Sequence, residues 1–191
     1  MLKLSDGILL YHGSYSEIPV IDLQKCSKGL DFGRGFYVTS NFQQALKYIP
    51  SSVKKNIKRR ILPDNFDIRT AKVSIYKLHL ADGLILHYFE EANLEWLHYV
   101  ASNRNSTLFE EFRKSLDSVD IVGGKIANDN TAMVLNSYVN GDYGQPGTER
   151  TDKFAIESLL PNKLENQFCF KTLKAINALE FVGSEPYGKY I

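Results

Sequence analysis

The fold is decided by one short stretch, Gly33-Arg34-Gly35-Phe36-Tyr37-Val38-Thr39. Two glycines one residue apart allow the backbone to turn sharply or to come close to a ligand. The β-branched and aromatic residues that follow favour a short strand. Because a strand holds a side chain more rigidly than a loop does, Tyr37 is predicted to form a wall beside a cleft. An ordinary turn and strand leading into a core helix is the alternative, since short glycine motifs often match by chance.

A helix is predicted directly after this strand. Ser40 and Gln43 form a capping-box pattern. Apolar residues then recur at helical spacing, at Phe42, Ala45, Leu46 and Ile49. Pro50 should interrupt this helix, because proline lacks an N–H and clashes with the preceding turn.

The composition is that of a soluble globular protein. The chain has 191 residues, of which 43% are hydrophobic and 24% charged, and this suits one domain over residues 1–191. The formal net charge of +1 creates no overall field that would attract nucleic acid or a membrane surface. Five basic residues lie between Lys54 and Arg60. A solvated helix face explains them better than a phosphate-binding site does.

Cysteine usage and hydropathy favour a cytoplasmic protein. Two cysteines, Cys26 and Cys169, are too few for a disulfide framework and lack the spacing of a zinc site. The first seven residues contain no apolar segment of the length that a signal peptide needs, and no apolar run is long enough to span a bilayer. We therefore expect a reduced compartment, no metal and no membrane partner.

Local patterns along the chain predict an α+β fold. Compact apolar runs or alternating patterns predict strands over residues 8–12, 72–80, 84–88, 166–170 and 178–183. Asp82-Gly83 is a hairpin signal between the second and third of these strands. Helical spacing predicts helices over residues 91–103, 128–139 and 151–160.

The predicted strand Asn166-Gln167-Phe168-Cys169-Phe170 has two different faces. Side chains alternate across a strand, so Phe168 and Phe170 share one face. Gln167 and Cys169 share the other face with Glu165. We expect the aromatic pair to point inward and the polar set to look into any cleft beside the strand.

Three motifs follow one another along the chain: Tyr11-His12-Gly13-Ser14, Gly33 to Tyr37, and Asn166 to Phe170. This order resembles the ADP-ribosyltransferase superfamily, in the branch of the poly(ADP-ribose) polymerases and diphtheria toxin, whose signature is a histidine, a tyrosine and a glutamate on three strands. The chain is also similar to an uncharacterised bacterial family of ADP-ribosyltransferase-like toxins, through Asp31 to Tyr37 and Ile121 to Leu135. The resemblance implies a split core of mixed and antiparallel β-sheet with flanking helices.

The resemblance also implies a site for NAD as substrate, without a metal. His12 would hydrogen-bond the adenosine ribose, the backbone of Gly13 would hold the nicotinamide amide, and Ser14 would support that turn. Tyr37 would stack on one face of the nicotinamide ring and Tyr48 on the other. The remaining residues that the resemblance assigns to this site are Arg34 and Gly35 of the glycine turn.

The chain departs from the signature at its third position, where Gln167 stands in place of glutamate. Glutamine can accept a hydrogen bond from a ribose hydroxyl, but it carries no charge to stabilise a cation. Loss of one pre-organised electrostatic group typically costs about a hundredfold to a thousandfold in rate. In arginine-modifying relatives the residue two before the glutamate helps to position the acceptor, so Glu165 is a candidate acceptor base. An exposed glutamate at the start of a strand is the equal alternative.

The resemblance therefore implies an NAD-dependent mono-ADP-ribosyltransferase, acting as a bacterial toxin or defence effector. Its acceptor would be a protein or a nucleic acid, and a small antitoxin protein would be its partner. A module that binds NAD or ADP-ribose without chemistry, and acts through a protein partner, is the alternative that Gln167 favours. Transfer chemistry on RNA, as in the tRNA 2′-phosphotransferases, is a third hypothesis and ranks lowest.

Overall fold

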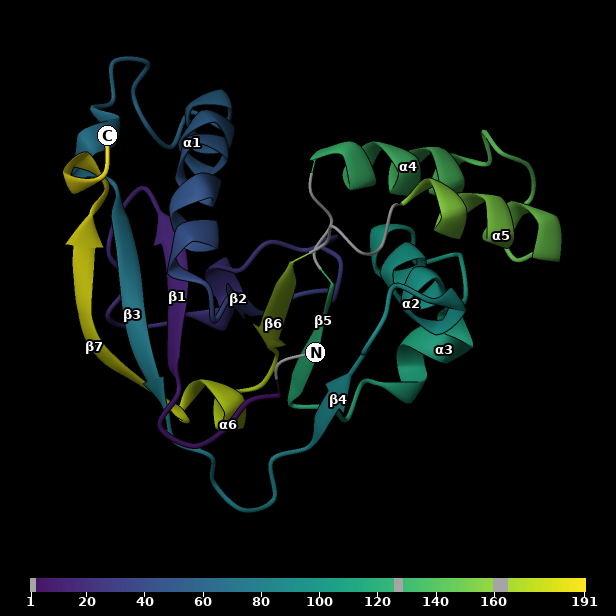
Figure 1. The fold of residues 1–191 in the computed structure, drawn as a ribbon, viewed down its shortest axis with the longest axis horizontal. Coiled ribbons are helices and arrows are strands. Elements are labelled where there is room, and N and C mark those ends of the chain that lie inside the picture. Colours follow the sequence, from purple (N-terminus) through teal and green to yellow (C-terminus); the bar gives the residue numbers. More distant parts are fainter. Residues whose placement is uncertain (1–2, 126–128, 160–164) are drawn as a thin grey trace.

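The computed structural model describes residues 3–125, 129–159 and 165–191 (Figure 1). Its strands are β1 (Leu9–Ser14), β2 (Phe36–Val38), β3 (Lys72–Leu78), β4 (Leu86–Tyr88), β5 (Ile121–Lys125), β6 (Asn166–Phe170) and β7 (Leu179–Pro186). Its α-helices are α1 (Phe42–Lys58), α2 (Leu94–Arg104), α3 (Glu110–Ser115), α4 (Asp129–Asn140), α5 (Glu149–Ser158) and α6 (Leu173–Ile176). Short 3₁₀ helices cover Leu23–Lys25, Ile68–Thr70 and Tyr187–Lys189.

The strands form two sheets, which confirms the predicted α+β class. The sheet β1-β3-β7 is antiparallel, whereas the sheet β2-β6-β5-β4 is mixed because β4 runs parallel to β5. In Figure 1 the first sheet lies on the left with α1, and the second sheet separates it from α2 to α5 on the right. An isolated bridge between Tyr11 and Thr39 joins β1 to β2, so the two sheets touch at this point.

Hydrophobic clusters fill the spaces between these layers. One lies between the two sheets, a second lies between the four-stranded sheet and α2 to α5, and a third lies between α1 and the three-stranded sheet. Fully buried members of the three clusters are, in that order, Leu10 and Tyr76, Trp96 and Tyr138, and Ile49 and Val73. Burial of such side chains stabilises the fold by roughly 1.5–3 kcal/mol each.

The alternation predicted for β6 is confirmed. Phe168 and Phe170 are fully buried in the cluster between the sheets. Cys169 points to the opposite side, where it is fully buried in the cluster beneath the helices. Gln167 shares that side by alternation and is also buried. The expectation that this polar set looks into an open cleft is therefore wrong for Cys169.

Helix α1 begins and continues differently from the prediction. Its N-cap is Asn41 rather than Ser40, because the Asn41 side chain accepts hydrogen bonds from the backbone N–H groups of Gln43 and Gln44. The helix also continues through Pro50 to Lys58. Proline in a helix interior costs about 3 kcal/mol, and the buried residues on both sides of Pro50, Ile49 and Val53, provide packing that offsets this cost.

The predicted hairpin at Asp82-Gly83 is wrong. The strand after it, β4, does not pair with β3 but lies in the other sheet beside β5. The carboxylate of Asp120 accepts a hydrogen bond from the backbone N–H of Ile85, which fixes the entry into β4 next to β5. The turn therefore carries the chain from one sheet to the other.

The remaining predicted helices correspond to α2, α4 and α5. Their predicted ends at Asn128 and Leu160 lie outside the described residues, as do residues 126–128 of the segment from Ile121 to Leu135. Within the described ranges, no helix combines the length and the hydropathy that a membrane crossing requires.

Candidate functional site

The three motifs of the sequence lie on neighbouring strands. β1 carries His12 and touches β2 through the bridge between Tyr11 and Thr39. β2 carries Tyr37 and pairs with β6, in the register Tyr37 opposite Cys169. Gln167 lies two residues before Cys169 on β6. Segments more than 100 residues apart in sequence therefore meet where the two sheets touch.

His12 is held in a defined tautomer. Its Nδ1 lies 2.7 Å from the carbonyl oxygen of Tyr37, and its ring lies 4.5 Å from that of Phe36, centroid to centroid. Since a carbonyl oxygen can only accept, Nδ1 carries the proton, and Nε2 of the neutral ring is left as an acceptor. Burial lowers the pKa of His12, although the hydrogen bond to Tyr37 partly opposes this shift. At neutral pH the ring therefore offers Nε2 to a hydroxyl donor.

The lowered pKa of His12 predicts a loss of stability in acid. In the native state the ring resists protonation, whereas in the unfolded chain it takes up a proton near pH 6.5. The unfolded state therefore binds more protons below that pH, and the free energy of unfolding falls by at most about 1.4 kcal/mol per pH unit. Urea unfolding from pH 8 to pH 5 should show wild type losing stability relative to His12→Asn. Parallel pH profiles of the two proteins would contradict this assignment.

Gly13 combines close packing with an open backbone edge. A Cβ atom at this position would lie 2.0 Å from the carbonyl oxygen of Ala45, so α1 rests directly on β1 here. Tyr11 exchanges both backbone hydrogen bonds with Thr39. N–H and C=O groups alternate in direction along a strand, so those of Gly13 point to the same side as those of Tyr11, toward β2.

At Gly13 the two strands have already parted. Continuing the bridge would place Gly13 opposite Tyr37, but the Tyr37 carbonyl is bonded to the His12 ring instead. Outside the ladder between β1 and β3, no backbone hydrogen bond joins Gly13 to another residue that the structure describes. The next residue, Ser14, is buried and lies opposite Lys72 of β3. A donor and an acceptor of one residue thus face the split between the sheets.

Tyr37 closes the glycine turn that precedes it. Its hydroxyl donates to the carbonyl of Gly33 at 2.6 Å and accepts from the backbone N–H of Phe32 at 3.0 Å. Gly33 has φ +80°, and a Cβ at Gly35 would lie 2.4 Å from the Cys169 sulfur, so the turn needs glycine at both places. Burial is the main cause that raises the pKa of Tyr37 well above its usual value. The phenol therefore stays protonated and the turn stays closed.

Two residues assigned by resemblance make contacts that the sequence did not indicate. Arg34 donates to the backbone carbonyls of Leu23 and Gln24 and so fastens the preceding loop. Tyr48 is 42% exposed on α1, and its ring lies beneath the ammonium of Lys55. The roles that the resemblance gives Arg34 and Tyr48 stay predictions.

Gln167 faces a buried ion pair that the sequence did not reveal. Its Nε2 lies 3.4 Å from Oδ2 of Asp31, a residue two positions before Gly33. Nη2 of Arg104 on α2 lies 2.6 Å from Oδ1 of the same aspartate, and Nη1 of Arg104 donates to Asn136 on α4. The turn, β6 and α2 therefore meet at one carboxylate, and Arg104 links this carboxylate to α4.

A cavity of about 250 Å³ lies at the end of β2. Its lining is hydrophilic and consists of Thr39, Ser40, Asn41, Gln44, Glu165 and Asn166. Oδ1 of Asn166 is buried and has no hydrogen-bond partner among the described residues, so it is available to a ligand donor. Glu165 thus lines a cavity, as its proposed role requires, whereas His12, Tyr37 and Gln167 do not belong to this lining.

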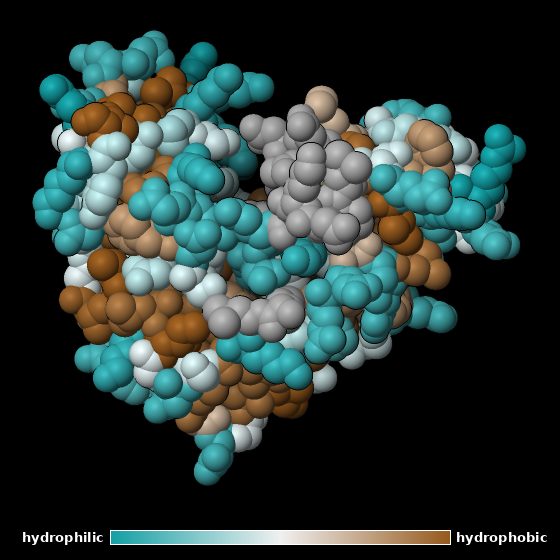
Figure 2. All heavy atoms as spheres, in the orientation of Figure 1, coloured by the Kyte–Doolittle hydropathy of each residue, from teal (hydrophilic) through white to brown (hydrophobic). Residues whose placement is uncertain are grey.

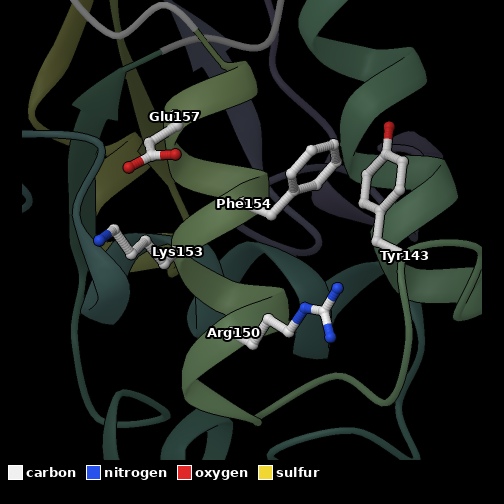
Figure 3. Close-up of a pocket in the computed structure, with 5 residues that line it drawn as sticks. All are labelled: Tyr143, Arg150, Lys153, Phe154 and Glu157. Atoms are coloured by element: carbon white, nitrogen blue, oxygen red, sulfur yellow. The ribbon is translucent and has the colours of Figure 1, made fainter.

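Other surface features lie away from the split. A hollow of about 400 Å³ on α5 is lined by Tyr143, Arg150, Lys153, Phe154 and Glu157 (Figure 3). Figure 3 shows the rings of Tyr143 and Phe154 facing each other, while Lys153 and Glu157 point to the other side of the helix. Figure 2 shows hydrophobic side chains gathered near the lower edge of the molecule, around α6 and the loop before β4. In Figure 1, α5 lies away from the strands that carry the three motifs, whereas α6 lies beside the lower ends of β1 and β6.

Sequence reasoning missed the residues that support the site. Asp31 belongs to the motif from Asp31 to Tyr37, but nothing in the sequence indicated a role for its charge. Arg104 lies in no motif. The hydroxyl of Thr39 donates to the side chain of Gln44 at 2.5 Å and accepts from the backbone N–H of Asn41 at 3.1 Å. Hydroxyl and amide residues directly after a glycine-led strand are the signal that could have pointed to this cavity.

Comparison with protein families places the chain in one of them. Residues 8–181 match the model of a family described as a protein of unknown function, DUF3990. Comparisons with curated proteins and with solved structures give no match. The matched residues include β1, the glycine turn and β6, and they make up most of the chain. The chain therefore belongs to the DUF3990 family of proteins of unknown function.

Proposed function

We propose that this chain is an NAD-dependent mono-ADP-ribosyltransferase with an ADP-ribosyltransferase-like fold. The observation that carries the proposal is the parting of β1 and β2 at His12, which turns the backbone N–H and C=O of Gly13 toward a gap. A primary amide such as that of nicotinamide needs one acceptor and one donor side by side, and a single residue of an open strand edge supplies both. Tyr37 and Gln167 lie on the next two strands, β2 and β6.

The reaction breaks the bond between the nicotinamide nitrogen and C1′ of the adjoining ribose. The bonding electron pair leaves with neutral nicotinamide, and C1′ becomes an oxocarbenium-like centre. A nucleophilic oxygen, nitrogen or sulfur of the acceptor then bonds to C1′ and loses its proton. The protein accelerates this step by holding the nicotinamide and ribose so that interactions strengthen as the bond lengthens.

Each proposed residue contributes a specific contact. Nε2 of His12 accepts a hydrogen bond from a hydroxyl of the adenosine ribose, as its tautomer permits. The aromatic ring of Tyr37 borders the nicotinamide. Glu165, in the cavity beside Asn166, accepts the proton that the acceptor nucleophile loses.

The biological role follows from the same proposal. A transferase of this kind that modifies a protein or nucleic acid of the host would act as a toxin or defence effector. Such an enzyme would require a neutralising antitoxin in the cell that makes it.

Release of nicotinamide from NAD tests the proposal. His12→Asn should lower kcat/KM for release by about fivefold to 150-fold, because loss of one buried hydrogen bond to a bound hydroxyl costs about 1–3 kcal/mol. His79→Asn is the matched control, since His79 is an exposed residue whose Nε2 contacts Glu180. Chromatographic detection of nicotinamide, with purified protein and cell lysate as acceptor source, gives the measurement. Absence of release by wild type under all acceptor conditions would defeat the proposal.

Gln167 favours a second candidate, an NAD-binding module without turnover. The amide cannot supply the charge that the signature glutamate supplies, whereas it still accepts a ribose hydroxyl. Such a module would gain thermal stability with NAD, by RT ln(1 + [L]/Kd), while releasing no nicotinamide. The two measurements together separate the candidates.

A further inference from the structure

The partner of Gln167 is a carboxylate, which fixes the orientation of the glutamine amide. Gln167 and Asp31 are 6% and 7% exposed, and Nε2 of the first lies 3.4 Å from Oδ2 of the second. An ionised carboxylate only accepts hydrogen bonds, so the NH₂ end of the amide must face Asp31. Oε1, the acceptor end of the Gln167 amide, therefore points away from Asp31.

The two oxygens of Asp31 have different partners. Oδ1 receives Nε and Nη2 of Arg104, at 3.1 and 2.6 Å, and Oδ2 receives the amide of Gln167. Ionised groups buried in this way need both charge pairing and hydrogen bonds to be tolerated. Arg104 supplies the opposite charge, and Gln167 supplies an uncharged donor.

Two neighbouring titratable groups, Tyr37 and Cys169, add no charge to this cluster. Tyr37 and Cys169 lie close enough to interact electrostatically with each other, and Tyr37 also interacts with Asp31. Burial raises the pKa of Tyr37 well above its usual value and that of Cys169 to about 12. Both groups are therefore neutral at physiological pH, and Arg104 is the cation that the structure pairs with Asp31.

A glutamate at position 167 would disturb this pairing. It would bring a second carboxylate to within roughly the same short distance of Asp31, with one guanidinium shared between the two. Like charges at such a distance disfavour each other's ionised form. Because Asp31 already supplies a carboxylate, the site requires an uncharged residue such as glutamine at position 167.

We propose that the negative charge of this site resides on Asp31, and that Gln167 is a positioning residue whose Oε1 is oriented by Asp31 toward the ribose of the dinucleotide. The second half of this statement rests on the proposed function, whereas the first half concerns the charge arrangement alone. A carboxylate that accepts from the amide NH₂ also makes the amide oxygen a stronger acceptor, because hydrogen bonds in a chain polarise one another. Gln167 is then an adaptation of the site to Asp31 and not the loss of a catalytic group.

Three variants test the charge arrangement by stability: Gln167→Glu, Asp31→Asn and the two changes combined. Gln167→Glu should lower the folding equilibrium constant at least tenfold at pH 8, and the deficit should shrink as the pH falls toward 5. The sign follows because the forced pair binds a proton more tightly in the native state than in the unfolded chain, so native stability falls as pH rises. The exchange variant Asp31→Asn with Gln167→Glu restores one carboxylate and one amide, and it should be more stable than the sum of the two single changes predicts. Gln145→Glu, in an exposed loop, is the matched control and should change little.

Nicotinamide release by the same proteins tests the positioning role. Gln167→Glu and Asp31→Asn should each release nicotinamide at least tenfold more slowly than wild type, and Gln145→Glu should match wild type. Faster release by Gln167→Glu, or its full stability at pH 8, would overturn the inference while leaving the proposed function standing. If wild type releases none, the proposed function and the positioning role both fall, and the stability measurements alone decide where the charge resides.

Discussion

Replacing Gly13 with alanine is expected to destabilise the protein by about 3 kcal/mol or more. The added Cβ would lie 2.0 Å from the carbonyl oxygen of Ala45 and 3.1 Å from Cγ1 of Ile49. The first distance is far shorter than any real contact, and the obstacle is helix backbone that cannot rotate away. Helix α1 would have to move off β1, and this movement would open the third hydrophobic cluster, to which Ile49 belongs. Urea unfolding followed by circular dichroism measures the change.

A comparison with Gly29→Ala isolates the effect of space. Gly29 has φ +70°, but no atom lies within 4 Å of a Cβ built on it. Its substitution should cost about 1–2 kcal/mol of backbone strain without any collision. If Gly13→Ala cost no more than Gly29→Ala, α1 would not rest on β1 as described. The proposed edge of Gly13 toward the split would then lose its structural basis.

Elements with strong local patterns are predictable from the sequence. The strand after the glycine turn, the buried strand β1 and the alternation of β6 each depend on a few neighbouring residues, and the structure contains all three. The predicted start of α1 is also nearly correct, since the observed N-cap, Asn41, lies one position after the predicted Ser40.

Features that depend on distant packing are not predictable in this way. Pro50 alone predicts a helix end, but burial of Ile49 and Val53 against the sheet keeps the helix continuous. Asp82-Gly83 alone predicts a hairpin, but the next strand, β4, pairs with β5 instead of β3. Local patterns report what a segment prefers by itself, and tertiary packing can override that preference.

In the candidate site, too, some residues can be predicted from local patterns and others cannot. His12, Tyr37 and Gln167 can be selected from the sequence because each lies in a motif with a strand pattern, and the structure places their strands side by side. The groups that determine their chemistry lie elsewhere. Asp31 and Arg104 are 73 residues apart, and no local pattern indicates that they meet beside Gln167.

Replacing Arg104 with methionine should destabilise the protein by about 3–5 kcal/mol. The long apolar side chain of methionine fills much of the same volume, but Asp31 would remain buried without its opposite charge. Arg104 also donates to Asn136 at 2.8 Å, so this hydrogen bond between α2 and α4 would be lost with the ion pair. Chemical unfolding at pH 7 is the measurement. An exposed ion pair on α3 provides the control, in which Nζ of Lys114 lies 2.8 Å from Oε1 of Glu110. Lys114→Met should change the free energy of unfolding little.

The double variant Asp31→Asn with Arg104→Met separates charge from packing. Removing both charges relieves the uncompensated carboxylate, so the double variant should be more stable than Arg104→Met alone. If the two changes were simply additive, the ion pair would contribute through packing only. Glutamine at position 167 would then need another explanation. If Asp31 and Arg104 interacted only weakly through their charges, a glutamate beside them would cost little. The stability of this pair therefore bears directly on why the chain carries an amide where the signature of the ADP-ribosyltransferases has a glutamate.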